Sequence, residues 1–281
     1  MRRFLIVTNR TKDTDLSVTK KIENYLKERK AICDIYDAPE EIPKELIADD
    51  LDCAIVLGGD GTILHAITPL VYYNIPILGV NMGTVGFLAS VELEDLEKAL
   101  LALLEGRYEY DDRIMLEGTV YRNGKQIFKA AGVNDIAISR SGFSRIIRFC
   151  IWLNGELVDS YGADGVVIAT PTGSTGYNLS AGGPVVSPCS DVLIITPISP
   201  HSLTSRSIVV SGNETIALQV ERIGQNDMEA AFITIDGQHG TRLKEKDRIE
   251  IKRANVKTRL LKVDRTGFFE VLRSKMGGRK L

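Results

Sequence analysis

The segment Leu57-Gly58-Gly59-Asp60-Gly61-Thr62 constrains the fold of this chain more than any other feature. An apolar run from Cys53 to Leu57 enters it, and apolar residues at helical spacing follow it. This pattern predicts a buried strand, a glycine turn and a helix. Glycines allow a phosphate to approach the backbone, and the free N–H groups at the start of a helix attract an anion.

Asp60 lies inside this turn. A carboxylate beside a bound phosphate is electrostatically unfavourable unless it takes up a proton or holds a metal ion. We therefore hypothesise that Asp60 is the chemical centre of a phosphate-transferring site. Gly-Gly-Asp-Gly also suits an ordinary tight turn, so the residues of the turn alone leave both interpretations open. Neither a Walker A pattern nor G-x-G-x-x-G is present here.

The composition is that of a globular protein without a nucleic-acid-binding surface. The chain has 281 residues, which predicts about two domains. It is 44% hydrophobic and 26% charged, and its net charge of −2 argues against a nucleic-acid partner. The four cysteines form no C-x-x-C pair, so we expect small core residues in a reducing compartment rather than zinc ligands or disulfides.

The apolar segments are short. The apolar part of the N-terminus, Phe4 to Val7, is too short for a signal peptide and lacks a small-residue cleavage site. No apolar run approaches the ~20 residues that span a bilayer. We therefore expect a cytoplasmic protein without a membrane partner.

The N-terminal part alternates strand and helix patterns, which predicts a parallel, Rossmann-like sheet with right-handed crossovers. The predicted strands are 4–7, 31–36, 53–57 and 75–80. The predicted helices are 18–26, 40–50, the segment after residue 62, and 93–104.

After Gly106 the pattern becomes that of antiparallel β structure. Asn123-Gly124 and Asn154-Gly155 are strong hairpin signals between strand-like runs. Further strands are predicted at 145–153, 166–169, 192–195, 215–220, 232–235, 248–251 and 257–263. We expect an α/β domain over 1–106 and a β-rich, sandwich-like domain over 107–265. A helix and tail over 266–281 are expected to pack back on the N-terminal domain.

A second polar segment follows Asp164-Gly165 and runs from Ala169 to Pro184. It is rich in glycines and hydroxyl side chains, which offer N–H and O–H donors to a polar ligand. The alternative is a long surface loop. Long loops in compact domains are usually functional or disordered, and the apolar strand that enters this one argues against disorder.

Four motifs occur in a characteristic order: Gly58–Thr62, Asn81-Met82-Gly83-Thr84-Val85-Gly86-Phe87-Leu88, Asn134-Asp135, and Thr170-Pro171-Thr172-Gly173-Ser174-Thr175-Gly176-Tyr177. Together they closely resemble the NAD kinase (ATP-NAD kinase) family, and the resemblance covers nearly the whole chain. The glycine turn alone is shared with the diacylglycerol kinase, sphingosine kinase and phosphofructokinase groups.

The resemblance implies an α/β N-terminal domain, a β-rich C-terminal domain and an NAD site between them. It implies the reaction ATP + NAD⁺ → NADP⁺ + ADP, with a divalent metal ion such as Mg²⁺. It also implies a homodimer or homotetramer. Whether ATP, polyphosphate or another nucleoside triphosphate is the preferred donor stays open, as does NADH as an acceptor.

The same resemblance implies that Asp60 is the general base on the adenosine ribose 2′-hydroxyl. A positioned carboxylate suits this task, because a ribose hydroxyl is a weak nucleophile that must lose its proton. The residues that the resemblance assigns to NAD and nucleotide binding are Gly58, Gly59, Gly61, Thr62, His65, Asn81, Gly83, Phe87, Asn134, Asp135, Arg145, Asp164, Thr175, Gly176, Tyr177, Asn178, Leu179, Ser180 and Gln238. The metal ligands cannot be named.

Several of these residues have a structural alternative. Asn134-Asp135 also reads as a turn between strands, and Tyr177 as a core-packing residue. His65 and Arg145 also suit solvent-facing positions on a helix and a strand. Asp236-Gly237, just before Gln238, is also a good hairpin turn.

Two other functions compete with NAD kinase. A lipid kinase shares the glycine turn, but it needs an apolar acceptor cleft and the segment 170–183 is polar. A catalytically silent dinucleotide-binding or sensing module is the other alternative, and the presence of Asp60 weighs against it.

Overall fold

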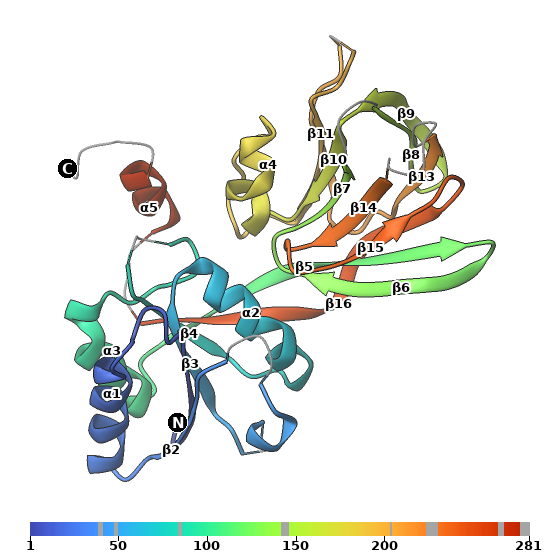
Figure 1. The fold of residues 1–281 in the computed structure, drawn as a ribbon. Helices are drawn as coiled ribbons and strands as arrows, with labels where there is room; N and C mark the ends of the chain where they lie inside the picture. Colours follow the sequence, from blue (N-terminus) through green and yellow to red (C-terminus); the bar gives the residue numbers. More distant parts are fainter. Residues whose placement is uncertain are drawn as a thin grey trace. The chain divides into compact units, whose positions relative to one another are not determined.

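The computed structural model describes residues 1–38, 42–47, 50–83, 86–141, 146–202, 204–222, 230–263 and 267–275. The chain forms two compact units, one of Met1–Arg113 with Lys257–Leu281 and one of Ile114–Val256. Strands β5 (Glu109–Arg122) and β16 (Arg248–Lys262) each continue from one unit into the other (Figure 1). The chain therefore divides at residues 113 and 256 in the structure, whereas the sequence pattern places the changes after residues 106 and 265.

The first unit is an α/β structure on a parallel sheet, as predicted. Its strand order is β2-β1-β3-β4-β16, and each neighbouring pair is parallel. The four N-terminal strands are β1 (Arg3–Thr8), β2 (Ile32–Tyr36), β3 (Cys53–Gly58) and β4 (Ile77–Asn81). Strand β16 joins this sheet because Leu260 pairs with Ile77, which is why the chain from residue 257 onward belongs to the first unit.

Helices cover both faces of this sheet (Figure 1). Helices α1 (Ser17–Glu28) and α3 (Leu96–Glu105) pack on one face, where Ile22, Leu26 and Leu100 join the apolar core. Helix α2 (Asp60–Leu70) lies on the other face against β3. Three short 3₁₀ turns complete the unit: η1 (Lys44–Leu46), η2 (Val71–Tyr73) and η3 (Leu93–Asp95).

One predicted helix of the first unit differs from the structure. The sequence predicts a helix over 40–50, but the described residues 42–47 form only the 3₁₀ turn η1. Among the described residues 42–47, the buried apolar side chains are Ile42 and Ile47, one on each side of that turn. Without a continuous apolar stripe, a helix would have no face to bury and helical propensity alone is too weak to hold it.

The parallel register brings the ends of β3 and β4 together. Gly58 pairs with Asn81, and the Met82 N–H donates to Gly58 O at 3.2 Å. Side chains that follow the carboxyl ends of neighbouring parallel strands share one edge of the sheet, where α/β proteins bind their ligands. The glycine turn and the start of the 81–88 segment therefore meet at this edge.

The second unit is built from two antiparallel sheets. One has the order β12-β11-β10-β7-β14-β15, and the other contains β16-β13-β8-β9 with β5 and β6. The remaining bounds are β6 (Lys125–Gly132), β7 (Asp135–Ser141), β8 (Ile147–Leu153), β9 (Glu156–Ala163), β10 (Gly165–Ala169), β11 (Val192–Ile198), β12 (Ile208–Ser211), β13 (Ile216–Arg222), β14 (Ala230–Ile235) and β15 (His239–Leu243). Residues from both sheets, such as Phe149 and Ile233, form one apolar core, which confirms the predicted sandwich-like domain.

Both predicted hairpin turns are present. Asn123-Gly124 joins β5 to β6 and Asn154-Gly155 joins β8 to β9, and all four residues have positive φ, as a two-residue hairpin turn requires. The strands predicted separately at 248–251 and 257–263 are instead one continuous strand, β16. This strand pairs with β4 near its C-terminal end and with β13 near its N-terminal end, and a local sequence pattern does not reveal this continuity.

Two further elements complete the fold. The polar segment after β10 forms two short helical turns, η4 (Thr172–Thr175) and α4 (Tyr177–Ser180), rather than a surface loop. The closing helix is α5 (Phe268–Lys275), which belongs to the first unit. No helix in the described part of the chain is long and apolar enough to cross a membrane.

Candidate active site

The glycine turn is held in place by Thr62. Thr62 is buried in the first turn of α2, and its hydroxyl accepts a hydrogen bond from the Asn9 amide at 3.2 Å. A Cβ added at Gly58 would lie 2.4 Å from Thr62 Oγ1, so the strand can end there only with glycine. Packing of the protein itself therefore explains the first glycine of the turn.

Gly59 and Gly61 differ from Gly58, because a Cβ added at either would meet nothing within 4 Å. Both have backbone conformations that other residues also adopt; Gly59, for example, has φ −101° and ψ −173°. Neither packing nor backbone strain requires glycine at these two positions. The space in front of them is available to a ligand that approaches the N-terminus of α2.

Asp60 is the first residue of α2 and its carboxylate is fixed by the 86–88 segment. Oδ2 accepts the Phe87 N–H at 2.8 Å, and Oδ1 accepts the Leu88 N–H at 3.0 Å. A Cβ added at Gly86 would lie 2.0 Å from Asp60 Oδ1, so only glycine allows this approach. The carboxylate is half-buried and is held in one orientation by both of its oxygens.

Asn81 organises the beginning of the same segment. It is buried, and its amide nitrogen donates to Gly83 O at 3.3 Å and to the Glu92 carboxylate at 3.0 Å. Its oxygen accepts the Gly83 N–H at 3.1 Å. Asn81 thus ties the chain after β4 back to the strand, and Gly83 is exposed beyond it. Thr84 and Val85 lie outside the described residues.

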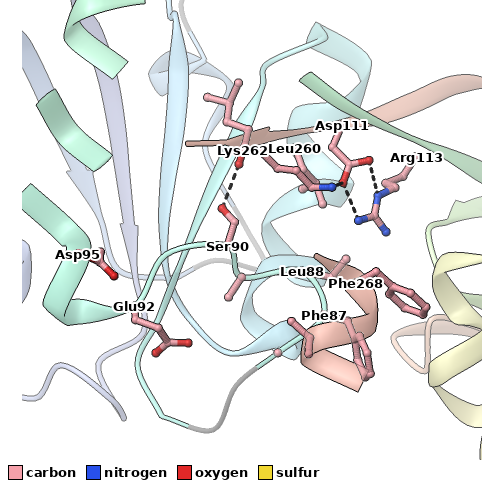
Figure 2. A pocket seen from close by; sticks show the side chains of 14 residues that line it. Phe87, Leu88, Ser90, Glu92, Asp95, Asp111, Arg113, Leu260, Lys262 and Phe268 are labelled. Atoms are coloured by element: carbon pink, nitrogen blue, oxygen red, sulfur yellow. Dashed lines mark hydrogen bonds and ion pairs between the residues drawn. The ribbon is translucent and has the colours of Figure 1, made fainter. Parts of the chain in front are cut away.

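Phe87 is enclosed by α5. Its ring centroid lies 5.7 Å from that of Phe268, and the Lys275 ammonium lies 4.7 Å from the Phe87 ring centroid. Phe87, Leu88 and Phe268 line a pocket of about 130 Å³ within the first unit (Figure 2). The helix that closes the chain therefore supports the segment that binds Asp60.

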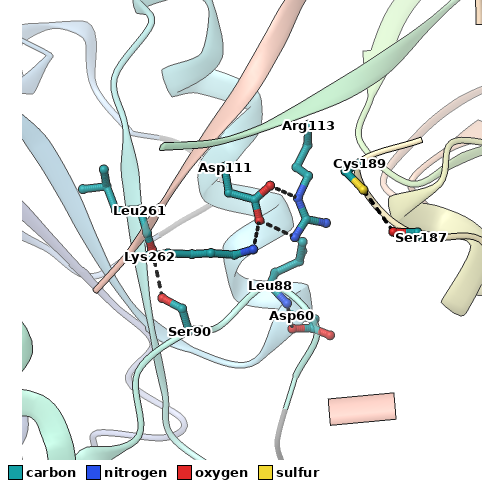
Figure 3. A network of polar contacts seen from close by, with 9 residues as sticks. All are labelled: Asp60, Leu88, Ser90, Asp111, Arg113, Ser187, Cys189, Leu261 and Lys262. Carbon is teal, nitrogen blue, oxygen red and sulfur yellow. Dashed lines mark hydrogen bonds and ion pairs between the residues drawn. The ribbon is translucent and has the colours of Figure 1, made fainter. Parts of the chain in front are cut away.

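A charge network of the buried Arg113 with the half-buried Asp111 and Lys262 forms one wall of this pocket (Figure 3). The Arg113 guanidinium makes two bonds to Asp111, at 2.8 and 2.7 Å, and Lys262 reaches the same carboxylate at 2.8 Å. Burial alone would raise the pKa of Asp111, but the bonds to Arg113 and Lys262 outweigh it and lower that pKa below its ordinary value. The sequence gives no sign of this network, because Lys262 is far along the chain from Asp111 and Arg113 and only the fold brings them together.

In the second unit, Asn134 and Asp135 lie at the start of β7, in a turn held by Asp236. The Asp236 carboxylate accepts the N–H groups of Val133, Asn134 and Asp135, at 2.7, 2.8 and 3.0 Å. Burial, followed by the negative charge of Asp236, raises the pKa of Asp135 to about 7. Asn134 and Asp135 therefore form a turn between strands, and the residues of the predicted binding site are the residues of that turn.

The 170–176 segment packs directly on this turn. Thr170 is fully buried; its N–H donates to Asn134 O at 2.9 Å and its hydroxyl donates to Val133 O at 2.5 Å. A Cβ added at Gly173 would lie 1.9 Å from Asn134 O. One added at Gly176 would lie 3.6 Å from Asp135 Oδ2, an ordinary contact. The two predicted motifs of this unit therefore form one cluster.

The residues of α4 divide into a buried and an exposed group. Asn178 is fully buried; its amide donates to Ser174 O and Pro184 O, and its oxygen accepts the Thr196 hydroxyl at 2.7 Å. Tyr177, Leu179 and Ser180 are exposed, and Thr175 and Gly176 are half-buried. The described contacts give Asn178 a structural part, and its contact with a ligand stays a prediction.

The other predicted binding residues are more scattered. Asp164 is half-buried and paired with Arg140 at 2.6 Å, a partner that the sequence does not single out. His65 is half-buried in the second turn of α2, and Gln238 lies in the turn between β14 and β15. Arg145 lies outside the described residues.

The described residues contain no group of three or more His, Cys, Asp or Glu side chains that could hold a metal ion. They therefore do not fit a resident metal centre built from protein ligands alone. Mg²⁺ is commonly held by one or two carboxylates together with substrate phosphates and waters.

These features define a class of protein. An open glycine turn at the start of a helix provides N–H groups for phosphate, and a fixed carboxylate stands at the same helix end. A second cluster brings together Asn134, Asp135 and the 170–176 segment, and amide and carboxylate side chains of this kind can bond to a sugar or base. These groups are the ones that a kinase acting on a nucleotide-like acceptor requires.

Comparison with known proteins specifies the family. Residues 4–108 match the ATP-NAD kinase N-terminal domain and residues 133–263 match the ATP-NAD kinase C-terminal domain. The chain is 43% identical to the NAD kinase of Lachnoclostridium phytofermentans, over 99% of each chain. It is 41% identical to that of Caldanaerobacter subterraneus, over 98% of this chain and 99% of the other.

Two solved structures share the fold. The NAD kinase of Archaeoglobus fulgidus in complex with ATP has a TM-score of 0.77 and 27% identity, over 98% of this chain and 97% of the other. Yeast NADH kinase complexed with NADH has a TM-score of 0.82 and 22% identity, over 99% and 88%. The chain therefore belongs to the ATP-NAD kinase family. Its activity is that of an NAD kinase, a phosphotransferase, and neither a lipid kinase nor a silent binding module is favoured.

Proposed function

We propose that Asp60 is the general base of the NAD kinase reaction in this chain. It accepts the proton of the 2′-hydroxyl on the adenosine ribose of NAD⁺. The oxygen then forms a bond to the γ-phosphorus of ATP, the bond from that phosphorus to the β-phosphate oxygen breaks, and ADP leaves. General-base assistance of this kind is typically worth about 10²–10⁴ in rate.

The observation that carries this proposal is the fixed orientation of the Asp60 carboxylate. Hydrogen bonds from Phe87 and Leu88 occupy one lone pair on each oxygen and leave the other available. The carboxylate stands at the N-terminus of α2, next to the open space at Gly59 and Gly61. A phosphoryl group bound to those N–H groups would be near the base without any movement of the backbone.

The second unit supplies the recognition of the dinucleotide in this proposal. The Asn134 amide is suited to an adenine edge, and the Asp135 carboxylate to ribose hydroxyls. The exposed ring of Tyr177 offers a face for stacking on a base. The other residues that the family resemblance assigns to nucleotide binding are proposed to contact NAD⁺ or ATP.

Mg²⁺ is proposed to enter with the phosphates of ATP, since the described residues offer no cage of protein ligands. When bound it would neutralise charge on the transferred phosphoryl group.

A homodimer or homotetramer is also proposed. Exposed apolar side chains on strands at the sheet ends, Leu157 on β9 and Val209 on β12, support it. Light scattering on the purified protein measures the oligomer directly.

The unpaired cysteines support the proposal of a cytoplasmic location. Cys33, Cys53, Cys150 and Cys189 are all unpaired. Cysteines that stay reduced are typical of a reducing compartment.

A product assay tests the proposed reaction. The protein is incubated with ATP, Mg²⁺ and either NAD⁺ or NADH, and the product is detected with an NADP-specific dehydrogenase. Polyphosphate and GTP replace ATP in parallel, and Mn²⁺ and Ca²⁺ replace Mg²⁺. We expect NADP⁺ formation from NAD⁺ and ATP. Binding of NAD⁺ without any product under all donors would contradict the catalytic proposal.

A further inference from the structure

Asp236 lies outside the predicted binding residues, yet its carboxylate holds the turn that carries two of them, Asn134 and Asp135. Its two carboxylate oxygens accept three consecutive backbone N–H groups, from Val133 to Asp135. In return, the Asp236 N–H donates to Asp135 O at 2.9 Å. A Cβ added at Gly132 would lie 2.8 Å from Asp236 Oδ1, so the chain before this turn also passes close to the carboxylate.

Two other hairpin turns of the same chain show how the Asp236-Gly237 turn differs. Asn123-Gly124, Asn154-Gly155 and Asp236-Gly237 all have positive φ at both residues. Asparagine serves in the first two, and Asn154 Oδ1 accepts a single N–H, from Thr215 at 3.0 Å. At the third turn an amide would present an NH₂ group to one of three N–H donors. The geometry therefore requires a carboxylate rather than a turn residue of any kind.

A carboxylate at position 236 carries an electrostatic cost, because it places a second negative charge beside Asp135. Burial raises the pKa of Asp135, and the charge of Asp236 raises it further, to about 7. Burial also raises the pKa of Asp236, but its three N–H donors favour the charged form. Asp135 has one such donor, the Tyr177 N–H, so a proton that enters the pair is held on Asp135.

Among the described residues, the charged groups that act on this pair are the two carboxylates themselves and His239. Asp236 acts on Asp135 from the turn after β14, and His239 of β15 favours the charged form of Asp236. The 170–177 segment presents only the Tyr177 N–H to Asp135. The negative charge of Asp236 is therefore the main external control on the protonation of Asp135 in the described part of the unit.

We propose that Asp236 is a positioning residue of the dinucleotide site. Its carboxylate holds the Asn134–Asp135 turn in the shape that receives NAD⁺, and its charge sets the pH range in which Asp135 binds. This proposal rests on the proposed contact between Asp135 and the dinucleotide. NAD⁺ then selects the ionised form of Asp135, whose oxygens accept hydroxyl hydrogen bonds, and its binding releases a proton near neutral pH.

Calorimetry of NAD⁺ binding tests the proposal on the full chain. Titrations from pH 5.5 to 8.5 in two buffers of different ionisation enthalpy count the protons released. The wild type should release roughly half a proton per site at pH 7 and lose affinity as the pH falls through that value. Asp135→Asn should abolish the release.

Asp236→Asn should weaken NAD⁺ binding by about tenfold or more, because a donor loses its charged acceptor. It should also move the midpoint of the pH dependence below that of the wild type, since the repelling charge is gone. Asp247→Asn is the matched control. Asp247 is buried in the same unit and accepts the Lys244 N–H at 2.8 Å, so its loss should lower the melting temperature without moving the midpoint.

Two results would overturn the proposal. One is unchanged NAD⁺ affinity in Asp236→Asn, and the other is weakened affinity with an unmoved midpoint, which indicates a merely structural role. If Asp135→Asn changes neither affinity nor proton release, the site assignment fails instead. Should Asp236→Asn not fold, a carboxyl ¹³C NMR titration of the wild type decides: no aspartate that titrates near pH 7 and vanishes in Asp135→Asn means that the proposal is wrong.

Discussion

The Asp60 carboxylate accepts the backbone N–H of Phe87, with 2.8 Å between Oδ2 and the nitrogen. These residues are 27 positions apart, in the segments that follow the neighbouring strands β3 and β4. The bond links the proposed base to the 86–88 segment. Because Phe87 in turn contacts Phe268, helix α5 supports the segment that orients this carboxylate.

Asp60→Asn should lower kcat by about 10²–10⁴ and leave the KM for NAD⁺ within a few-fold, because the proton acceptor is lost while the binding groups remain. Steady-state kinetics with ATP and Mg²⁺ measure both constants. Phe268→Leu is the control: it loosens the same 86–88 segment but keeps the carboxylate. An equal loss of kcat in the two variants would assign Asp60 an architectural role only.

Gly58→Ala and Gly59→Ala should fail in different ways. The methyl group at position 58 would lie 2.4 Å from Thr62 Oγ1, so we expect a lower melting temperature. The methyl group at position 59 meets nothing within 4 Å, so the fold should be unaffected while activity falls at least tenfold. Thermal unfolding and kinetics on both proteins separate these effects. Full activity in Gly59→Ala would show that no ligand phosphate approaches that glycine.

Gly173→Ala and Gly176→Ala offer a similar pair in the second unit. The added methyl group at 173 would lie 1.9 Å from Asn134 O, which must displace the Asn134–Asp135 turn. We expect a large rise in the KM for NAD⁺ and reduced stability. At 176 the methyl group would lie 3.3 Å from Gly173 O, a tight contact that a shift of a few tenths of an ångström relieves, so we expect a much smaller loss of stability and affinity than at 173. Thermal unfolding and kinetics measure the two losses, and equal losses at 173 and 176 would contradict the described packing.

Asp111→Asn should destabilise the first unit by about 1.5–3 kcal/mol, because the charged acceptor of Arg113 and Lys262 is lost. Chemical unfolding measures this difference. Glu97→Gln is the control; it removes an exposed pair with Lys21 and should cost less than about 1 kcal/mol.

The contribution of the Asp111 carboxylate to stability should fall as the pH is lowered. The pKa of Asp111 is lower in the folded protein than its ordinary value, so its contribution is complete above about pH 4 and is lost as the pH falls through the folded value. The stability gap between wild type and Asp111→Asn should therefore narrow from pH 5 towards pH 3. A gap that is constant over this range would contradict an ionised Asp111.

The local patterns predicted most elements because each carried its own signal. The helix over 17–28 has an apolar stripe of Val18, Ile22 and Leu26, and the hairpins at 123 and 154 have Asn-Gly. The 40–50 segment lacked such a stripe and was predicted wrongly as a helix. The split prediction for β16 has a different cause, since continuity of this strand is decided by its pairing with β4 and β13, which are far from it in the chain.

The sequence by itself determined the glycine turn with Asp60, the order of the four motifs, and hence the family and its reaction. Those are properties of residues that are close in the chain, where spacing alone defines the geometry. The tertiary structure decided which groups hold the motifs: Phe87 and Leu88 on Asp60, and Asp236 on the Asn134–Asp135 turn. Such contacts join residues 27 to 103 positions apart, and only the pairing of strands brings them within hydrogen-bond distance.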